Sequence, residues 1–323
     1  MFEDLIPFPA ILRAHAAWLE NPADGCRADL SGRTLNEIDM SGMNFRLANF
    51  AGATFLDTNL AGADLSMARL ERADLQRANL AGADLSGATL AQATLAGAVL
   101  NGTNLSEVNA VGTEFRNVRL VNARMLEAEV REAIFRHASA IGASFHQSRF
   151  YDVDFSESKL DETMFYRVRL QHTKFIGASA TGATFAASKI DHCDYDRAIL
   201  TGAKFARAEI LQCSFRKTDL RDCDFREAKL RGGDFGRAVL AGARFGSAML
   251  TMADFRGANL TGARELTPEQ LTQALTDRET LLPNGSRGPF IRHSGAEKCA
   301  RPSEPRRDGE GSPEQADQLL RTP

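Results

Sequence analysis

The sequence predicts an all-β solenoid, in which the chain winds into a coil of short strands, and three periodic observations lead to this fold class. Residues 28–262 divide into units of five residues without an insertion or deletion, as in ANLAG, ADLSG and ATLAQ at residues 78–92. The third residue of the unit is Leu or Phe in 38 of the 47 units. Gly occupies nine of the 12 positions that follow one another at intervals of 20 from residue 42 to residue 262.

The period of five excludes both regular alternatives. Five residues advance an α-helix by about 500°, so the Leu and Phe positions would be spread around all of its sides. On a flat strand, an odd period sends successive units to opposite faces of the sheet. The chain must therefore turn once per unit and always the same way. Because a residue that favours a left-handed backbone recurs in every fourth unit, we expect four sides to one coil.

The N-terminal segment, residues 1–27, is predicted to hold a short amphipathic helix that caps the first coil. In PAILRAHAAWLEN, the side chains of Ile11, His15 and Trp18 fall on one helical face. A solenoid leaves apolar side chains and unpaired backbone at its ends, so it needs such caps. We expect Trp18, the only tryptophan, to lie over the first coil.

The repeat region, residues 28–263, is predicted to have a solid interior. Of the 17 Phe at the core position, 15 fall on alternate units, so two opposite sides carry Phe ladders and the sides between them carry mostly Leu. Alternating large and smaller side chains fill a narrow interior without voids. This interpretation leaves no room for a ligand inside the coil.

The segment at residues 264–285 is predicted to hold a C-terminal capping helix. In LTPEQLTQAL, Thr267 takes the N-cap position and Gln270 completes a capping box. We expect Leu271 and Leu275 to cover the last coil.

The rest of the chain and its overall composition suggest where the protein acts. Residues 286–323 are rich in Pro, Gly and mixed charge, which is typical of a disordered tail. No apolar stretch approaches the ~20 residues of a membrane span, and Glu3 and Asp4 stand where a signal peptide carries positive charge. The five cysteines lack the spacing of a metal site, and their odd number disfavours a disulfide framework. We therefore expect a cytoplasmic protein.

Units such as ADLSG, ANLAG and AKFAR resemble those of the pentapeptide-repeat family, over residues 28–263. The resemblance implies a right-handed quadrilateral β-helix with short α-helical caps at both ends. At about 4.8 Å per coil, the 47 units would form about twelve coils of four pentapeptides and a rod about 55 to 60 Å long. Both flanks, including TLLPNG, resemble those of many bacterial members.

Two stacked pairs of residues raise the question of metal or redox chemistry. His172 and His192 occupy the same outward position four units apart, so their rings should stack about 5 Å apart on adjacent coils. Two imidazoles bind a divalent metal only with further ligands, and Asp191 is the one obvious candidate nearby. We interpret the pair as surface residues rather than a metal site. Cys193 and Cys213 stack at the inward small-residue position, so we expect buried thiols rather than a redox pair.

The sequence indicates no catalytic residues and no cofactor. The many Asp and Asn residues at the second position of the unit, such as Asn59 and Asp84, are expected to bond to the local backbone. We find neither a Gly-rich phosphate loop nor a nucleophile elbow in the sequence. A coil of this kind offers mainly its outer surface, so we expect a non-catalytic protein-interaction or scaffold protein.

The partner is open between two classes. Some members of the resembling family imitate the shape and charge of DNA, bind type II topoisomerases such as gyrase and protect them from quinolones. That interpretation requires an acidic rod, yet residues 28–263 contain 28 acidic and 28 basic residues, and the register has no interrupting loops.

The rival interpretation is a rigid platform for another protein, with Tyr151 and Tyr166 as exposed anchors and His172 and His192 on the same surface. We expect no direct binding to nucleic acid or membrane, because the formal net charge is only -3. A homodimer through the C-terminal helix stays open.

Overall fold

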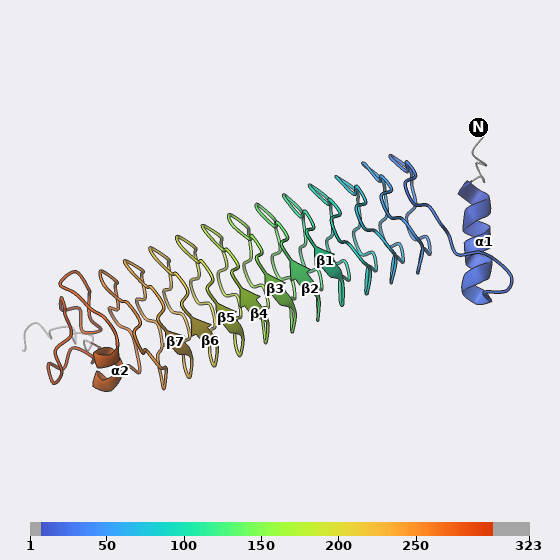
Figure 1. Ribbon diagram of the computed structural model, residues 1–323. Coiled ribbons are helices and arrows are strands. Elements are labelled where there is room, and N and C mark those ends of the chain that lie inside the picture. Colours follow the sequence, from blue (N-terminus) through green and yellow to red (C-terminus); the bar gives the residue numbers. More distant parts are fainter. Residues whose placement is uncertain (1–7, 300–323) are drawn as a thin grey trace, which may run out of the picture.

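The structure, a computed structural model, describes residues 8–299. It is an all-parallel β-solenoid whose coils stack from α1 (Phe8–Glu20) at one end to α2 (Pro268–Gln273) at the other (Figure 1). Between the helices, seven three-residue strands form one parallel sheet in chain order. These strands are β1 (Asn109–Val111), β2 (Glu129–Arg131), β3 (Arg149–Tyr151), β4 (Arg169–Gln171), β5 (Lys189–Asp191), β6 (Glu209–Leu211) and β7 (Lys229–Arg231).

The pairing register confirms the four-unit period inferred from glycine. Ala110 pairs with Val130 and Leu170 with Ile190, so each partner stands in the fourth unit further along the chain. Outside the named strands, isolated parallel bridges keep this spacing, from the pair Asp29 and Asn49 at one end of the repeat region onward. Each residue therefore lies beside its equivalent on the next coil.

The interior is filled by the side chains that the period of five predicts. Every fifth residue from Leu30 to Leu260 is buried, and from Ala48 onward so is the small residue two positions earlier. The rings of Phe165 and Phe185 stack with centroids 4.8 Å apart, and Phe175 meets Phe185 edge to face at 5.9 Å. The two expected Phe ladders are therefore present, and they touch each other across the axis.

Each unit ends in a corner whose residue has a left-handed backbone. The residue two positions after every core residue has a positive φ, for example 66° at Gly62 and 50° at His172. The amide of Gly62 donates to the carbonyl of Ala81 on the next coil at 2.9 Å. The left-handed corner therefore occurs in every unit and not only where the sequence places glycine. Non-glycine residues are held there although this conformation costs about 1 to 2 kcal/mol each.

The N-terminal helix contacts the first coil differently from what the sequence suggested. The helix residues that pack against the core are Phe8, Ile11 and Leu12. His15 is buried, and its Nδ1 accepts a hydrogen bond from the amide of Ala28 at 3.1 Å. Trp18 is half-buried and stacks on the ring of His15 at 5.8 Å. That Trp18 lies over the first coil stays a prediction, and the contact the structure gives for its ring is the one with His15.

The predicted capping box starts α2. The Thr267 hydroxyl accepts from the amide of Gln270 at 3.3 Å, and the Gln270 side chain accepts from the amide of Thr267 at 2.7 Å. Leu271 is buried, as expected. Leu275 is 49% exposed and pairs with Asp254, so the expectation that it covers the last coil is wrong. The helix ends before Leu275, and the chain there continues the parallel ladder.

The segment after α2 is ordered further than its composition suggested. Phe290 packs against the core, Ala296 is buried, and the Cys299 thiol lies 3.0 Å from the carbonyl oxygen of Ala263. The expectation of disorder is therefore wrong for residues 286–299, where a few apolar side chains cover the end of the coil. The remainder of the expected tail, residues 300–323, lies outside the described residues. Within residues 8–299, no helix has the length and apolar character that crossing a membrane requires.

Candidate interaction surface

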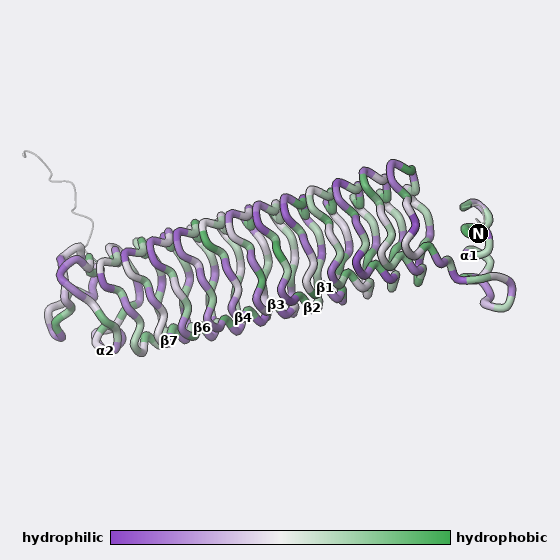
Figure 2. Tube along the Cα trace, turned by 45° about the horizontal axis from the view of Figure 1, so that its top comes forward, coloured by the Kyte–Doolittle hydropathy of each residue, from purple (hydrophilic) through white to green (hydrophobic). Residues whose placement is uncertain are grey.

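The named strands form one side of the coil, which we call the β1–β7 wall. The middle residue of each strand points inward and is buried, whereas the first and third residues face outward. Hydrophilic and hydrophobic residues accordingly alternate along the chain within each coil (Figure 2). The first residues of the strands form the midline of the wall. They are Asn109, Glu129, Arg149, Arg169, Lys189, Glu209 and Lys229.

The four residues proposed from the sequence all border this wall. Tyr151 is the last residue of β3, and Tyr166 stands three residues before β4. His172 follows directly after β4, and His192 directly after β5. The structure therefore places at this wall the four residues that the sequence proposed for one surface.

Both tyrosines are half-buried rather than exposed, which corrects the sequence-based expectation. The guanidinium of Arg131 lies over the ring of Tyr151 at 4.9 Å from its centroid, and that of Arg167 lies over Tyr166 at 5.1 Å. The ring of His146 also lies 5.7 Å from that of Tyr166. These neighbours cover one part of each ring and restrict its movement, so each tyrosine presents a partly exposed ring at one edge of the wall.

The two histidines lie one above the other on adjacent coils with ring centroids 5.4 Å apart, close to the expected spacing, but their rings are tilted by 38°. His192 Nδ1 lies 2.7 Å from a carboxylate oxygen of Asp191. The described part of the chain contains no group of three or more His, Cys, Asp or Glu side chains arranged to hold a metal ion. Both histidines are exposed at the corner of the wall.

The midline carries a charge pattern that was not among the sequence-based predictions. The cations of Arg149, Arg169 and Lys189 follow one another in register on β3, β4 and β5. Their recurrence in every fourth unit is the same signal that identified the histidine pair, so it was visible in the sequence.

The cysteine pair lies inside the coil beneath the wall. Cys193 and Cys213 are buried and free, and the amide of Cys193 lies 3.3 Å from the sulfur of Cys213. Burial raises the pKa of the Cys193 thiol well above its usual range. A thiol that stays protonated is a poor nucleophile, so the geometry favours structural thiols over redox chemistry.

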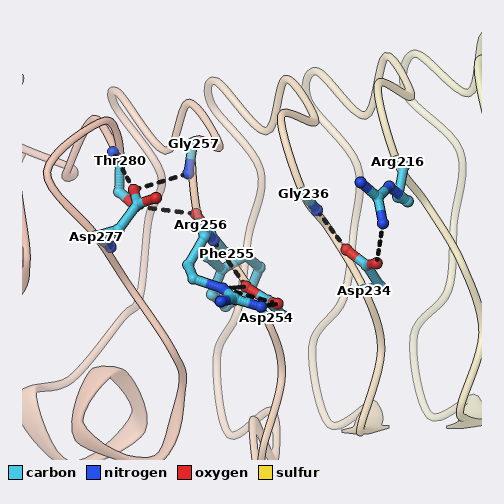
Figure 3. A network of polar contacts seen from close by, with 9 residues as sticks. All are labelled: Arg216, Asp234, Gly236, Asp254, Phe255, Arg256, Gly257, Asp277 and Thr280. Carbon is cyan, nitrogen blue, oxygen red and sulfur yellow. Dashed lines mark hydrogen bonds and ion pairs between the residues drawn. The ribbon is translucent and has the colours of Figure 1, made fainter.

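A second polar cluster lies near the C-terminal end of the coil (Figure 3). The carboxylate of Asp234 accepts from the amide of Gly236 at 2.8 Å and from Arg216 at 3.3 Å. Arg256 pairs with Asp254, and this hydrogen bond lowers the pKa of the carboxyl group. These acids are occupied by backbone amides and guanidinium groups, so they stabilise the turns, as the sequence predicted for Asp at this position.

Asp277 attaches the segment after α2 to the coil in the same way. Its Oδ1 accepts from the amides of Gly257 at 2.9 Å and Thr280 at 3.0 Å. The Thr280 hydroxyl in turn lies 3.0 Å from the carbonyl oxygen of Phe255 (Figure 3). Asp277 and Gly257 are separated by the length of four pentapeptides, whereas the bridges from Asp254 to Leu275 and from Asn259 to Leu281 span 21 and 22 residues. The segment after the helix therefore departs from the exact spacing of the coil while it stays attached to it.

Solved structures similar to this chain include pentapeptide-repeat proteins. HetL, involved in the regulation of heterocyst differentiation in the cyanobacterium Nostoc sp. strain PCC 7120, is 24% identical, with 84% of this chain and 97% of HetL covered and a TM-score of 0.31. QnrB1, a plasmid-mediated fluoroquinolone resistance protein, is 20% identical over 52% of this chain and 89% of QnrB1, with a TM-score of 0.31. A protein from the thylakoid lumen of Arabidopsis thaliana is 26% identical over 37% of this chain and 68% of its own, with a TM-score of 0.24.

The curated proteins contain no match to this chain. The family model of pentapeptide repeats matches more than half of it, and that of the pentapeptide repeat region matches residues 88–165. The repeat matches are residues 27–60, 55–92, 148–185, 188–222, 198–237 and 223–262. With the unbroken five-residue register and the parallel solenoid, these matches show that the chain belongs to the pentapeptide-repeat family.

Proposed function

We propose that the chain is a non-catalytic scaffold that binds a protein partner through the β1–β7 wall. The observation that carries this proposal is the pair of tyrosines at the edges of the wall, each held in place by an arginine. Tyrosine is enriched among the residues that contribute most to protein interfaces. A ring that is already fixed loses little conformational freedom when a partner binds.

The rod itself supports this proposal. We infer about twelve right-handed coils of four sides, closed by α1 and by the segment from α2 to residue 299, because bridges between equivalent units run along the whole repeat region. The interior is occupied by stacked rings, so binding falls to the outer walls. We propose the cytoplasm as the place of action, since the buried thiols of Cys193, Cys213 and Cys223 suit a reducing compartment.

A site-specific crosslinking experiment tests the proposal. A photoreactive phenylalanine analogue is placed at Tyr166, and in the matched control at Thr181, an exposed residue half a coil away from Gln171 on the wall. In a lysate of the source organism, we expect Tyr166 to crosslink to one protein reproducibly and Thr181 to give little product. Equal crosslinking from both positions, or none from Tyr166, would reject the wall as the binding surface.

Topoisomerase protection is the alternative, and the charge of the rod counts against it. The 28 acidic and 28 basic residues of 28–263 give no net negative charge with which to imitate DNA. A gyrase supercoiling assay with and without a quinolone separates the two proposals. We expect neither inhibition nor rescue by the purified protein at micromolar concentration.

The structure also bears on the proposed homodimer. Gln270 and Leu271 of α2 are buried, and the side-chain amide of Gln270 donates to the carbonyls of Phe245 and Ala248 at 2.8 Å each. The helix is therefore already engaged with its own coil, which favours a monomer. Light scattering tests this, with a dimer as the contradicting result.

A further inference from the structure

We infer that the centre of the β1–β7 wall binds a short acidic segment of the partner protein. The inference rests on the proposed function and specifies the charge of the segment by which the partner binds. It starts from the three midline cations, Arg149, Arg169 and Lys189. Arg149 is in register with Arg169, and Arg169 with Lys189, so their side chains leave the wall side by side.

This arrangement is unfavourable for the isolated rod. Like charges directly opposite one another on neighbouring strands are destabilising, and neighbouring coils are only about 4.8 Å apart. The side chains of Arg149 and Lys189 are 56% and 64% exposed. A bound anion removes this repulsion.

The chain itself neutralises the three cations only in part. Arg169 forms no ion pair with any of residues 8–299. Arg149 reaches Glu129 only at 3.8 Å, because that carboxylate bonds more closely to Arg131 at 2.7 Å. Lys189 reaches Glu209 only at 3.9 Å, while Glu209 bonds to Lys229 at 2.7 Å. Arg169 is therefore unpaired within residues 8–299, and Arg149 and Lys189 have only long ion pairs, which carboxylates from outside can replace or complete.

The length of the cationic stretch determines what kind of anion fits. Glu129 and Glu209 stand at its two ends on the midline, so it extends over two coil steps, about 10 Å. Proteins that bind nucleic acid through its backbone commonly neutralise about 6 to 10 phosphates, which needs a longer cationic surface without acids at both ends. Two or three carboxylates of an acidic peptide match the available length.

The tyrosines give this stretch its borders. Tyr151 ends β3 on one edge, and Tyr166 precedes β4 on the other, so the stretch between them passes Arg149 and Arg169. A peptide seated on the cations would contact at least one ring, and the phenol hydroxyls can donate hydrogen bonds to its carbonyls. Arginine, moreover, can hold a carboxylate through two parallel hydrogen bonds.

The chain contains a matched control for long-range electrostatics. Another column of three cations lies at a corner of the coil, with one cation in every fourth unit. Its members are Arg197, Lys217 and Arg237. All three are exposed, and none forms an ion pair with another described residue. This column carries the same charge as the midline cations, but Asp196 lies next to it in the sequence. The one tyrosine within two residues of its members is Tyr195, whose ring is buried in the core and cannot contact a bound peptide.

The test measures the binding of a fluorescein-labelled peptide of alternating Glu and Ser to the full chain by fluorescence anisotropy, with a Gln and Ser peptide as the neutral probe. The triple variant Arg149→Gln, Arg169→Gln, Lys189→Gln is compared with Arg197→Gln, Lys217→Gln, Arg237→Gln. We expect the first triple to weaken binding of the acidic peptide by about tenfold or more and the second by less than about twofold. The neutral peptide should not bind.

Several results would overturn the inference. Equal losses in the two triple variants would indicate non-specific attraction, and the absence of binding to the unaltered chain would remove the site. Tighter binding of a single-stranded oligonucleotide of the same charge would replace the acidic peptide by nucleic acid. In thermal unfolding, the first triple should match or exceed the unaltered chain in Tm, and a clear fall would assign the cations a structural role instead.

Failure of this inference can be distinguished from failure of the proposed function. If the acidic peptide does not bind but Tyr166 still crosslinks to a partner, the wall binds protein through another chemistry. If Tyr166 also gives no crosslink, the proposed function itself fails.

Discussion

Tyr195 shows how strictly a single position in the interior is specified. Its ring continues a Phe ladder, stacked 4.6 Å from Phe175 and 4.8 Å from Phe215. Its hydroxyl is buried and has no hydrogen-bond partner in the described chain. Burial also raises the pKa of the phenol well above its usual range, so it stays neutral.

Replacing Tyr195 by Phe should therefore stabilise the protein. Removing a buried hydroxyl without a partner relieves a desolvation penalty of about 1 to 3 kcal/mol, and the ring stacking is kept. Denaturant unfolding of Tyr195→Phe is expected to show a higher midpoint. Phe215→Tyr is the matched control and should lower the midpoint, and a loss of stability in Tyr195→Phe would reveal a hidden partner for the hydroxyl.

His15 makes the contact between α1 and the first coil dependent on pH. Its Nδ1 accepts from the amide of Ala28, which requires the neutral ring. Burial lowers the pKa of His15 below its ordinary value of 6.5, and the nearby charge of Arg27 adds to this effect. The detached helix binds the proton more readily than the docked helix. The free energy that the contact contributes is therefore fully present above pH 6.5 and is lost progressively as the pH falls below 6.5.

The fluorescence of Trp18, which stacks on His15, reports this change. We expect the emission to change between about pH 6.5 and pH 5, with a shift that is absent in His15→Gln. An identical pH response in His15→Gln would assign the effect to another group.

At the scale of elements, the position of α2 depends more on the contacts of one side chain, Gln270, than on the intrinsic stability of the helix. The amide of Gln270 satisfies the carbonyls of Phe245 and Ala248 at the end of the repeat, and its oxygen closes the capping box. A six-residue helix has little stability of its own, so these contacts decide its position.

Gln270→Ala should destabilise the C-terminal end by about 2 kcal/mol, because it leaves the buried carbonyl of Ala248 without a donor and removes one of the two donors to the carbonyl of Phe245. Thr272→Ala, which removes an exposed hydroxyl on the same helix, should have little effect. Hydrogen exchange of the amides in residues 245–281 measures the difference. Equal protection in both variants would contradict the role given to Gln270.

The elements also show which parts of the fold the sequence could predict. The period of five fixes the inward side chains from Leu30 to Leu260, because each coil meets the same packing requirement as its neighbours. The ends are aperiodic, so Leu275 and Phe290 could not be placed by the same rule. Their positions depend on tertiary contacts with the last coils, which no local pattern encodes.

The candidate site was predictable to a similar extent. Once the four-unit period is known, the repeat places His172 and His192 in one corner column and Tyr151 in the column next to it. The half-buried state of Tyr151 depends on Arg131 of the coil before it, a side-chain contact that spacing alone does not predict.

At the scale of the whole molecule, stability should be close to a sum of coils and their contacts. Deletion of residues 78–97 removes one full coil and keeps every column in register, so we expect a folded, shorter rod. Deletion of residues 78–94 removes almost as much chain but turns core residues outward, and it should yield an aggregated or unfolded protein.

Circular dichroism and gel filtration of the two deletions measure the contrast. If both fold equally well, pairing between equivalent residues of neighbouring coils does not determine the structure.

The measurement that tests the central claim most directly is the affinity of the partner crosslinked at Tyr166 for the double variant Tyr151→Ala, Tyr166→Ala. If the wall is the binding surface, the variant should keep the fold and lose affinity by at least about tenfold, while Thr181→Ala on the opposite side leaves it unchanged. Unchanged affinity of the tyrosine variant would show that the rod binds its partner through another wall.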